Sequence, residues 1–259
     1  MYKVKRFSKI NSNVYQKDYS WIGNLGKKYR RKAIDIIENS IKENQSKASM
    51  SISRFHGQTH VNNPKIESKL LREAKKNNAR TVGMTYDNTI SRNSKLNFNK
   101  RSKDLTDSEI NAIGDRYDPL DRPVQKLKNA RKSNENIIFH PNGSGIEQLS
   151  HEIGHIMNRN SKNPISKVIS DSETAMYHNS ERMKDKKGLL NVAKGYIKGK
   201  VKLHEESKAT KKGLGLMKKL GANENEMKLA KRNLNSNLDA YRSESKLSYL
   251  YPLKNTINK

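Results

Sequence analysis

The chain has 259 residues, which fits one domain or one domain with appendages. Its 53 lysine and arginine residues against 26 aspartate and glutamate residues give a formal net charge of +27, a field that attracts nucleic acid, an anionic membrane surface or an acidic protein. Because it has no cysteine, the sequence excludes a disulfide scaffold and a thiolate metal site.

The first part of the chain is predicted to be a flexible terminus, a helix and a loop. Residues 1–20 are polar and basic, and we expect them to be flexible. An amphipathic helix is predicted near residues 22–46, because isoleucines recur at helical spacing at Ile34, Ile37 and Ile41. Residues 47–63 contain a glycine and several polar side chains, so they are predicted to form a loop.

Helix and strand signals then alternate with a long polar stretch. Asn63 followed by Pro64 is typical of a helix start, and this helix is expected to end near Asn77. Residues 81–86 are the best strand candidate of the N-terminal half. Residues 87–135 predict a functional cover or a disordered segment. This stretch is interrupted by one short helix with a capping box at Thr106 and Glu109 and a stop at Gly114.

The second half begins with a short strand and a turn that lead into a helix. Residues 137–139 are apolar between polar neighbours, which predicts a strand, and residues 140–145 predict a turn. Beyond residue 180 the pattern is nearly all helical, with predicted segments at 188–198, 202–220 and 224–250. Their ends are indicated by a stop at Gly221 and an N-cap pair at Asn223 and Glu226.

The helix after this turn contains the motif H-E-x-x-H, at His151, Glu152 and His155. Histidines four residues apart on a helix lie one turn above each other, so both imidazoles can bind one zinc ion. Glu152 lies beside them, where it can take a proton from zinc-bound water. The apolar residues gather on the other side of the helix, at Ile146, Leu149, Ile153, Ile156 and Met157. A buried face therefore backs a polar face that bears the groups zinc chemistry needs.

Zinc needs a third protein ligand, with water in the fourth position. The sequence has no cysteine and does not continue as H-E-x-x-H-x-x-G-x-x-H, so we expect a carboxylate from downstream. The carboxylates that compete for this place are Asp171, Glu173, Glu181, Glu205, Glu206, Glu224, Glu226, Asp239 and Glu244.

A segment of the predicted helix at 202–220 resembles the ligand helix of the glutamate-type zincins, in which the pattern Glu-x-x-Ala-(Asp/Ser/Thr) supplies the third ligand. Glu206, Ala209 and Thr210 match it, and the segment is especially similar to the bacterial neutral zinc metallopeptidase group. The resemblance covers roughly residues 137–250. It implies that Glu206 is the third ligand, that Ala209 lets two helices approach closely, and that Thr210 hydrogen-bonds behind a ligand.

Two other carboxylates stay open as the third ligand. Glu205 would take the place of Glu206 after a shift of one residue in register. Asp239 lies in a segment that also resembles a ligand helix. The chain departs from the neutral zinc metallopeptidase group in one respect, because those relatives are membrane-anchored and this sequence has no comparable segment. A basic version of this kind would suit a phage or mobile-element protein.

The remaining histidines carry weaker signals. His56 and His60 are four residues apart, but no apolar periodicity supports a helix there, so we interpret them as loop residues. His140 is expected at the edge of the cleft. The donors that could stabilise a tetrahedral oxyanion are His178, His204, Tyr177 and Tyr241, although Tyr241 continues an apolar helical stripe and is better explained as a core residue.

The N-terminus is basic without an apolar stretch behind it, so it does not predict a secretory signal. No segment approaches the roughly 18 apolar residues of a membrane span. We therefore expect a cytoplasmic protein with no transmembrane segment, with export by a signal-free route as the alternative.

Together these features predict an α+β, zincin-like fold, with a small sheet packed on the H-E-x-x-H helix and a mostly helical C-terminal half. The expected division is a flexible basic N-terminus (1–20), a helical and strand region with a long loop (21–133), and a zinc metallopeptidase core (134–259). Residues 137–139 are the candidate edge strand for an extended substrate.

The expected function is zinc-dependent hydrolysis of peptide bonds in a protein or peptide substrate. One zinc ion is bound by His151, His155 and Glu206, and Glu152 is the catalytic base. One alternative is a basic protein that binds nucleic acid or an anionic surface and has a structural or vestigial zinc site. Another alternative is a peptidase toxin or effector delivered to another cell.

Overall fold

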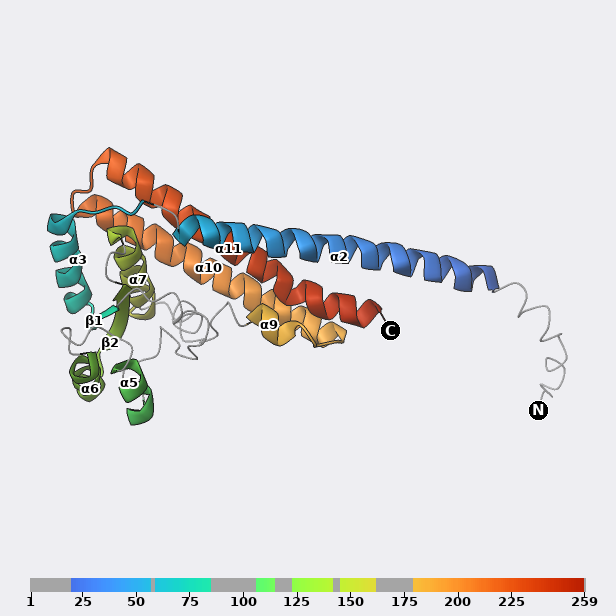
Figure 1. Ribbon diagram of the computed structural model, residues 1–259, viewed down its shortest axis with the longest axis horizontal. Helices are drawn as coiled ribbons and strands as arrows, with labels where there is room; N and C mark the ends of the chain where they lie inside the picture. Colours follow the sequence, from blue (N-terminus) through green and yellow to red (C-terminus); the bar gives the residue numbers. More distant parts are fainter. Residues whose placement is uncertain are drawn as a thin grey trace, which may run out of the picture.

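A computed structural model of the chain describes residues 20–56, 59–84, 106–114, 123–141, 145–161 and 179–258 (Figure 1). In chain order the described elements are α2 (Ser20–His56), α3 (Pro64–Lys76), β1 (Ala79–Met84), α5 (Asp107–Gly114), α6 (Pro123–Ser133), β2 (Asn136–Pro141), α7 (Ile146–Arg159), α9 (Asn179–Met183), α10 (Leu189–Lys219) and α11 (Glu224–Ile257).

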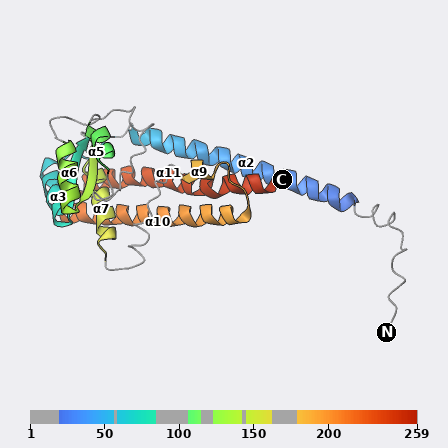
Figure 2. The ribbon, with the colours of Figure 1, turned by 90° about the horizontal axis from the view of Figure 1, so that it is seen from below.

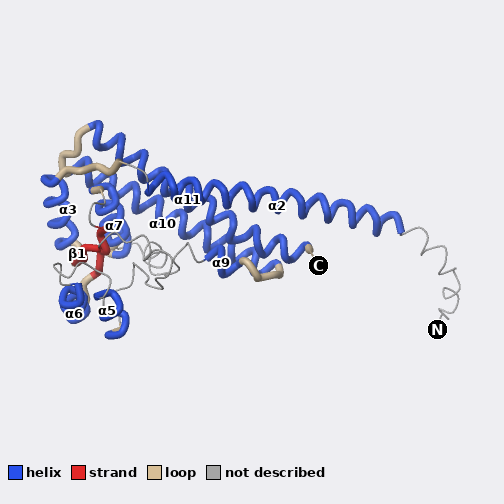
Figure 3. The backbone as a smooth tube through the Cα atoms, viewed as in Figure 1, coloured by secondary structure: helices blue, strands red, loops and turns tan. Residues whose placement is uncertain are grey.

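These elements form a small α+β unit at one end of an elongated helical bundle. The long helices α2, α10 and α11 run side by side, and the two strands lie with α3, α5, α6 and α7 at one end of them (Figures 1 and 2). Helix dominates the described chain, and strand is confined to this one end (Figure 3). The α+β class expected from the sequence is therefore confirmed, with most of the C-terminal half helical.

The sheet of the described residues consists of β1 and β2, which pair in parallel with Ala79 opposite Asn136 and Val82 opposite Phe139. Alternate residues of a strand point to opposite faces. Accordingly, Ile137 packs with α5 and α6, and Ile138 packs with α3 and α7. Both predicted strands are present, and β2 packs against the motif helix α7 as expected.

The apolar face of α7 forms the centre of the core. Leu149 and Ile153 are fully buried and Ile156 is 2% exposed, among side chains of α3, β2, α10 and α11. The amphipathic pattern predicted this face correctly. Its burial directs the opposite face of α7, with both motif histidines, toward α10.

Helix α10 differs from the sequence prediction, which split it into segments at 188–198 and 202–220. It is one continuous helix, Leu189–Lys219, with Gly195 and Gly199 inside it. A Cβ on Gly195 would lie 2.1 Å from the carbonyl oxygen of Ser248, and one on Gly199 would lie 2.6 Å from the Oγ of Ser245. These glycines therefore bring α10 against α11, and the packing offsets their weak helix propensity.

Helix α2 is also longer than predicted, because residues 47–56 continue the helix where a loop was expected. The sequence pattern does not predict this extension, because contacts with other parts of the fold stabilise the helix there. Ala48 is 4% exposed, and α2 packs along α11 through Ile37 and Ile41. The helix α11 likewise ends at Ile257, beyond the predicted residue 250.

The predicted helix ends are largely confirmed. The side chain of Asn63 accepts hydrogen bonds from the backbone N–H groups of Lys65 and Ile66 at the start of α3. Asn223 and Glu226 form a reciprocal capping box at the start of α11. Gly221 has φ +96 just after α10, a backbone conformation that favours glycine. The short helix predicted between Thr106 and Gly114 is α5.

Several sequence predictions fall on residues that the structure does not describe. These are the flexible terminus up to residue 19 and the polar stretches at 85–105 and 115–122. None of the described helices has the length and apolar character needed to cross a membrane.

Candidate metal centre

The backbones of α7 and α10 come into direct contact where the candidate site lies. A Cβ on Gly154 would lie 2.3 Å from the carbonyl oxygen of Ala209, and a Cβ on Gly213 would lie 2.7 Å from that of Ser150. Any larger side chain at either glycine would push the helices apart. The close approach expected at Ala209 is thus present, and the glycine inside the H-E-x-x-H motif takes part in it.

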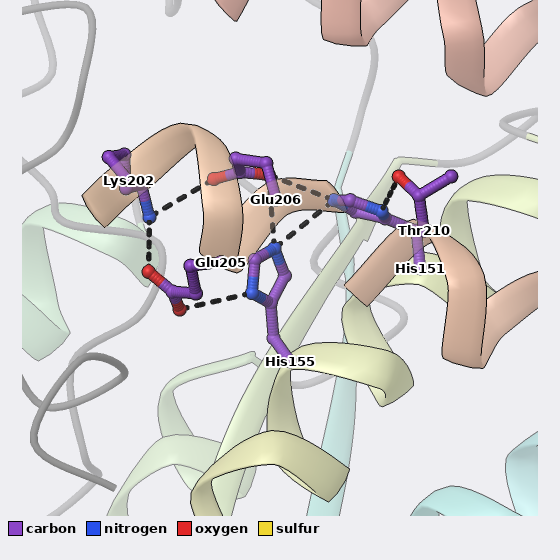
Figure 4. A network of polar contacts seen from close by, with 6 residues as sticks. All are labelled: His151, His155, Lys202, Glu205, Glu206 and Thr210. Atoms are coloured by element: carbon purple, nitrogen blue, oxygen red, sulfur yellow. Dashed lines mark hydrogen bonds and ion pairs between the residues drawn. The ribbon is translucent and has the colours of Figure 1, made fainter. Parts of the chain in front are cut away.

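Three side-chain atoms converge between these helices (Figure 4). The Nε2 atoms of His151 and His155 are 3.1 Å apart. The Oε2 atom of Glu206 lies 3.1 Å from the first and 3.2 Å from the second. Ligand atoms around a tetrahedral zinc ion at 2.0–2.1 Å are about 3.3–3.4 Å apart, so this nearly equilateral triangle matches one face of such a site. The group of His151, His155 and Glu206 could hold a metal ion.

Burial differs among the three residues. The side chains of His155 and Glu206 are each 3% exposed, whereas that of His151 is 12% exposed. Glu152, the next residue along α7, is half-buried and is not a member of the ligand group. The site is therefore closed on the side of His155 and more accessible on the side of His151.

Each imidazole has a second partner at its Nδ1 atom. The Oε1 atom of Glu205 lies 3.2 Å from Nδ1 of His155, and the Oγ1 atom of Thr210 lies 3.1 Å from Nδ1 of His151. A carboxylate accepts a hydrogen bond, so Glu205 favours the His155 tautomer with its proton on Nδ1. That tautomer leaves Nε2 with a lone pair toward the ligand group, which is how partners of this kind orient metal-binding histidines.

A buried lysine completes the network. The Nζ atom of Lys202 lies 3.0 Å from Oε1 of Glu206 and 3.2 Å from Oε2 of Glu205. Its side chain is only 15% exposed, so it neutralises part of the charge of two neighbouring buried carboxylates. Because Lys202 binds one oxygen of Glu206, the other oxygen faces the histidines. Sequence reasoning missed Lys202, since its spacing from Glu205 and Glu206 is its only distinguishing signal in so basic a chain.

These contacts shift the protonation of the site. Burial lowers the pKa of His155, but the charge of Glu206 and the hydrogen bonds to Glu205 and Glu206 outweigh it and raise that pKa to about 10. Burial raises the pKa of Glu206, but protonated His155 and the hydrogen bonds from both histidines outweigh it and hold that pKa well below its usual range. A metal ion that binds here must therefore displace a proton from His155.

The competing carboxylates whose side chains the structure describes lie outside the ligand group. Asp239 forms an ion pair with Arg242 and its side chain is 58% exposed, so it does not belong to the ligand group. Glu205 is buried beside the group, but it contacts the Nδ1 atom of His155. Of the other candidates, Asp171 and Glu173 lie outside the described residues.

His60 lies in the segment between α2 and α3, where it contacts a buried carboxylate. Its Nδ1 atom lies 2.8 Å from Oε1 of Glu147, a fully buried carboxylate that also accepts hydrogen bonds from the backbone of Val61 and from Asn233. Glu147 thereby ties the segment after α2 to α7 and α11. This arrangement accounts for His60 as a structural residue.

The remaining candidates whose side chains the structure describes do not belong to the ligand group. His56 is the last residue of α2, so its assignment to a loop was wrong. His204 is exposed and Tyr241 is half-buried. The structure does not describe the side chains of His140, expected at the edge of the cleft, or of the candidate oxyanion donors Tyr177 and His178.

Comparison of the chain with family models, with curated proteins and with solved structures found no match in any of the three.

Proposed function

We propose that this protein is a zinc-dependent metallopeptidase with a zincin-like fold. The observation that carries the proposal is the triangle formed by Nε2 of His151, Nε2 of His155 and Oε2 of Glu206, with sides of 3.1, 3.1 and 3.2 Å. Two of its members belong to an H-E-x-x-H helix, whose glutamate stays outside the triangle. That division of roles is the one a hydrolytic zinc site requires.

The donor atoms favour zinc over the common hard cations. Calcium and magnesium prefer sites made of oxygen ligands, whereas two imidazoles and one carboxylate suit zinc. Iron also uses two histidines and a carboxylate, with octahedral geometry and open positions. Histidines one helical turn apart, with a glutamate between them, favour zinc in this comparison.

When bound, zinc supplies Lewis-acid chemistry, since it polarises a scissile carbonyl and makes water a better nucleophile. Glu152 takes the proton of the attacking water and delivers it to the leaving amine. Its negative charge contributes to the raised pKa of His155, which is consistent with a carboxylate close to the ligand group. Glu205 and Thr210 hold the two imidazoles with Nε2 toward the metal.

The deciding experiment compares the wild-type protein with Glu152→Gln. Both proteins should contain one zinc per chain, because Glu152 is not a ligand. Hydrolysis of a casein or mixed-peptide substrate should fall by more than the roughly 10²–10⁴-fold typical of lost acid–base catalysis, since the attacking water also loses its orientation. A variant that cleaves as fast as the wild type would refute the mechanism.

The same experiment tests the alternative of a binding protein. A protein that binds zinc stoichiometrically yet cleaves no peptide bond would be a binding protein with a structural metal site. His151→Ala and His155→Ala serve as controls for metal content, because two remaining ligands rarely hold zinc against water.

A further inference from the structure

The first turns of α10 expose a stripe of apolar side chains to solvent. Leu189, Leu190, Tyr196 and Ile197 are 74%, 68%, 49% and 59% exposed. At about 100° per residue, these four and Ala193 fall on one side of the helix. We name this surface the α10 stripe. It contains four of the eight large apolar side chains that are strongly exposed in the described part of the chain.

The opposite side of the same turns is committed to the bundle. Gly195 and Gly199 bring the backbone of α10 against Ser248 and Ser245 of α11. Of the α10 stripe, Tyr196 also contacts α11, since its ring centre lies 5.6 Å from that of Tyr249. Figure 2 shows α10 along the outer edge of the bundle, with α11 on one side of it. This part of α10 thus has one face packed closely against α11 and another face with apolar side chains exposed to solvent.

Lysines surround the α10 stripe. Residues 184–200 include six lysines and a single acidic residue, Asp185, and all six lysines are exposed. Lys194 and Lys198 follow the stripe along one flank of the helix. The Nζ atom of Lys200 lies 5.5 Å from the centre of the Tyr196 ring. Lysine side chains of this kind can lay their apolar stems on a hydrocarbon boundary while the ammonium groups reach phosphates.

We propose that the α10 stripe and its flanking lysines bind an anionic lipid surface. An exposed apolar face flanked by lysines is the pattern of helices that lie in the plane of a membrane interface. Exposed leucine and isoleucine gain from hydrocarbon, whereas nucleic acid offers phosphates without an apolar surface to receive them. A second copy of the chain would bring the same net charge of +27 to the contact.

This binding surface is separate from the candidate metal centre, although one helix carries both. Glu206 follows Ile197 by nine residues of α10, which is about 14 Å along the helix axis. A chain bound through the α10 stripe would therefore hold its metal centre near the lipid surface. The inference does not depend on the proposed peptidase activity, and its test uses no catalytic readout.

The test is co-sedimentation of the full chain with vesicles at physiological salt. Wild-type protein should bind vesicles of phosphatidylcholine with phosphatidylglycerol much more than vesicles of phosphatidylcholine alone. Leu190→Gln/Ile197→Gln, which keeps the net charge, should weaken that binding at least about tenfold. Its matched control is Ile36→Gln/Met50→Gln, which removes two apolar side chains of α2 that are 61% and 49% exposed and should bind as the wild type does.

A second pair of substitutions tests the charges. Lys194→Gln/Lys198→Gln should weaken binding to the anionic vesicles by about 25-fold, because each lysine near such a surface supplies about fivefold in affinity. Thermal unfolding of every variant should match the wild type, since all substituted side chains are exposed or half-exposed at the surface.

Four results would overturn the proposal. The first is wild-type protein that does not sediment with anionic vesicles, and the second is equal loss in the α10 variant and the α2 control. A concentration-dependent dimer that Leu190→Gln/Ile197→Gln abolishes, measured by sedimentation velocity without vesicles, would assign the α10 stripe to a second copy. If Leu190→Gln/Ile197→Gln lost duplex DNA binding by the same factor as vesicle binding, the α10 stripe would be assigned to nucleic acid.

Discussion

At the residue scale, two consecutive glutamates of α10 have different parts in the candidate metal centre. Glu206 directs Oε2 to the Nε2 atoms of both histidines, whereas Glu205 contacts Nδ1 of His155. Lys202 lies against both carboxylates, so neither is an uncompensated buried charge. Neighbouring residues of a helix are separated by about 100° around its axis, and this offset lets one carboxylate reach the metal position while the other reaches the back of an imidazole.

The first prediction concerns the third ligand. Glu206→Ala should weaken zinc binding more than about 100-fold, a larger loss than second-sphere substitutions typically cause, because it removes a donor atom that no described neighbour replaces. Asp239→Ala should leave zinc affinity unchanged, since Asp239 is 58% exposed and paired with Arg242. Competition against a chromogenic chelator measures both values. Equal zinc affinity in the Glu206 variant and the wild type would eliminate Glu206 as a ligand.

The second prediction concerns pH, for protein stripped of metal with a chelator. The pKa of His155 is raised from its usual value near 6.5 to about 10, so its protonated form is favoured by the fold. The stabilisation is complete below pH 6.5 and is lost as pH rises toward 10. The pKa of Glu206 is lowered, so its contribution is present above pH 4.5 and is lost on acidification. The temperature of the thermal unfolding midpoint should therefore decrease as the pH is raised from 6.5 to 10.

A variant isolates the histidine in that pH range. His155→Gln cannot be protonated, so its thermal midpoint should vary less between pH 6.5 and 10 than that of the wild type. In the wild type, zinc binding at pH 7.5 should release a proton, which calorimetry in buffers of different ionisation enthalpy would measure. Zinc uptake without proton release would contradict the protonation assigned to His155.

At the scale of elements, small residues decide where the long helices touch. Gly154 and Gly213 let α7 and α10 meet at the candidate metal centre, and Gly195 and Gly199 let α10 meet α11 farther along. A helix with glycines would be weak in isolation, but here each packed glycine permits a backbone contact that a Cβ would prevent. Helix α10 therefore connects the motif helix to the bundle.

The third prediction tests this contact with two glycine-to-alanine substitutions. Gly154→Ala places a Cβ 2.3 Å from the backbone oxygen of Ala209, so α7 and α10 must separate. We expect a loss of about 1–3 kcal/mol in the free energy of unfolding, together with weaker zinc binding. Gly215→Ala is the matched control, because a Cβ there meets nothing within 4 Å.

The control should behave in the opposite way. Replacing an exposed helical glycine by alanine stabilises a helix by roughly 0.5–1 kcal/mol, so Gly215→Ala should be neutral or stabilising. Urea unfolding gives both values. If Gly154→Ala proved as stable as Gly215→Ala, the helix approach at the candidate metal centre would be looser than described.

At the scale of the whole molecule, charge dominates the surface. The net charge of +27 is distributed along the chain and is not confined to one segment. Such a surface attracts any polyanion at low salt, in addition to the lipid contact proposed for the α10 stripe. This attraction for polyanions should be long-ranged, because it is electrostatic. It should depend little on nucleotide sequence, because no base-reading module is visible in the sequence.

The fourth prediction follows from counterion release. Binding of duplex DNA or RNA should be detectable at low salt and should weaken steeply between 50 and about 200 mM salt, with little sequence preference. Fluorescence anisotropy of labelled oligonucleotides at several salt concentrations tests this. An affinity that stays constant over that range would contradict the electrostatic explanation.

Local patterns in the sequence predicted the parts of the fold that depend on near neighbours. The motif His151, Glu152 and His155, the apolar face of α7 and the capping box at Asn223 all follow from spacings of three or four residues. The strand β2 was likewise visible as a short apolar run at residues 137–139, and β1 overlaps the best strand candidate of the N-terminal half. The choice of Glu206 over its neighbours relied on resemblance to a ligand helix rather than on local spacing.

Tertiary structure alone decided which atoms meet between elements. The contact of His155 with Glu206 spans 51 positions in the sequence, and its geometry depends on how α7 and α10 are rotated against each other. A rotation of α10 by one residue would exchange Glu205 and Glu206, and the sequence does not encode that rotation in any local pattern. The same reason explains why Lys202 was missed and why the helix that contains Gly195 and Gly199 was predicted as two segments. Their roles come from close packing with another helix, and packing is a property of the assembled core.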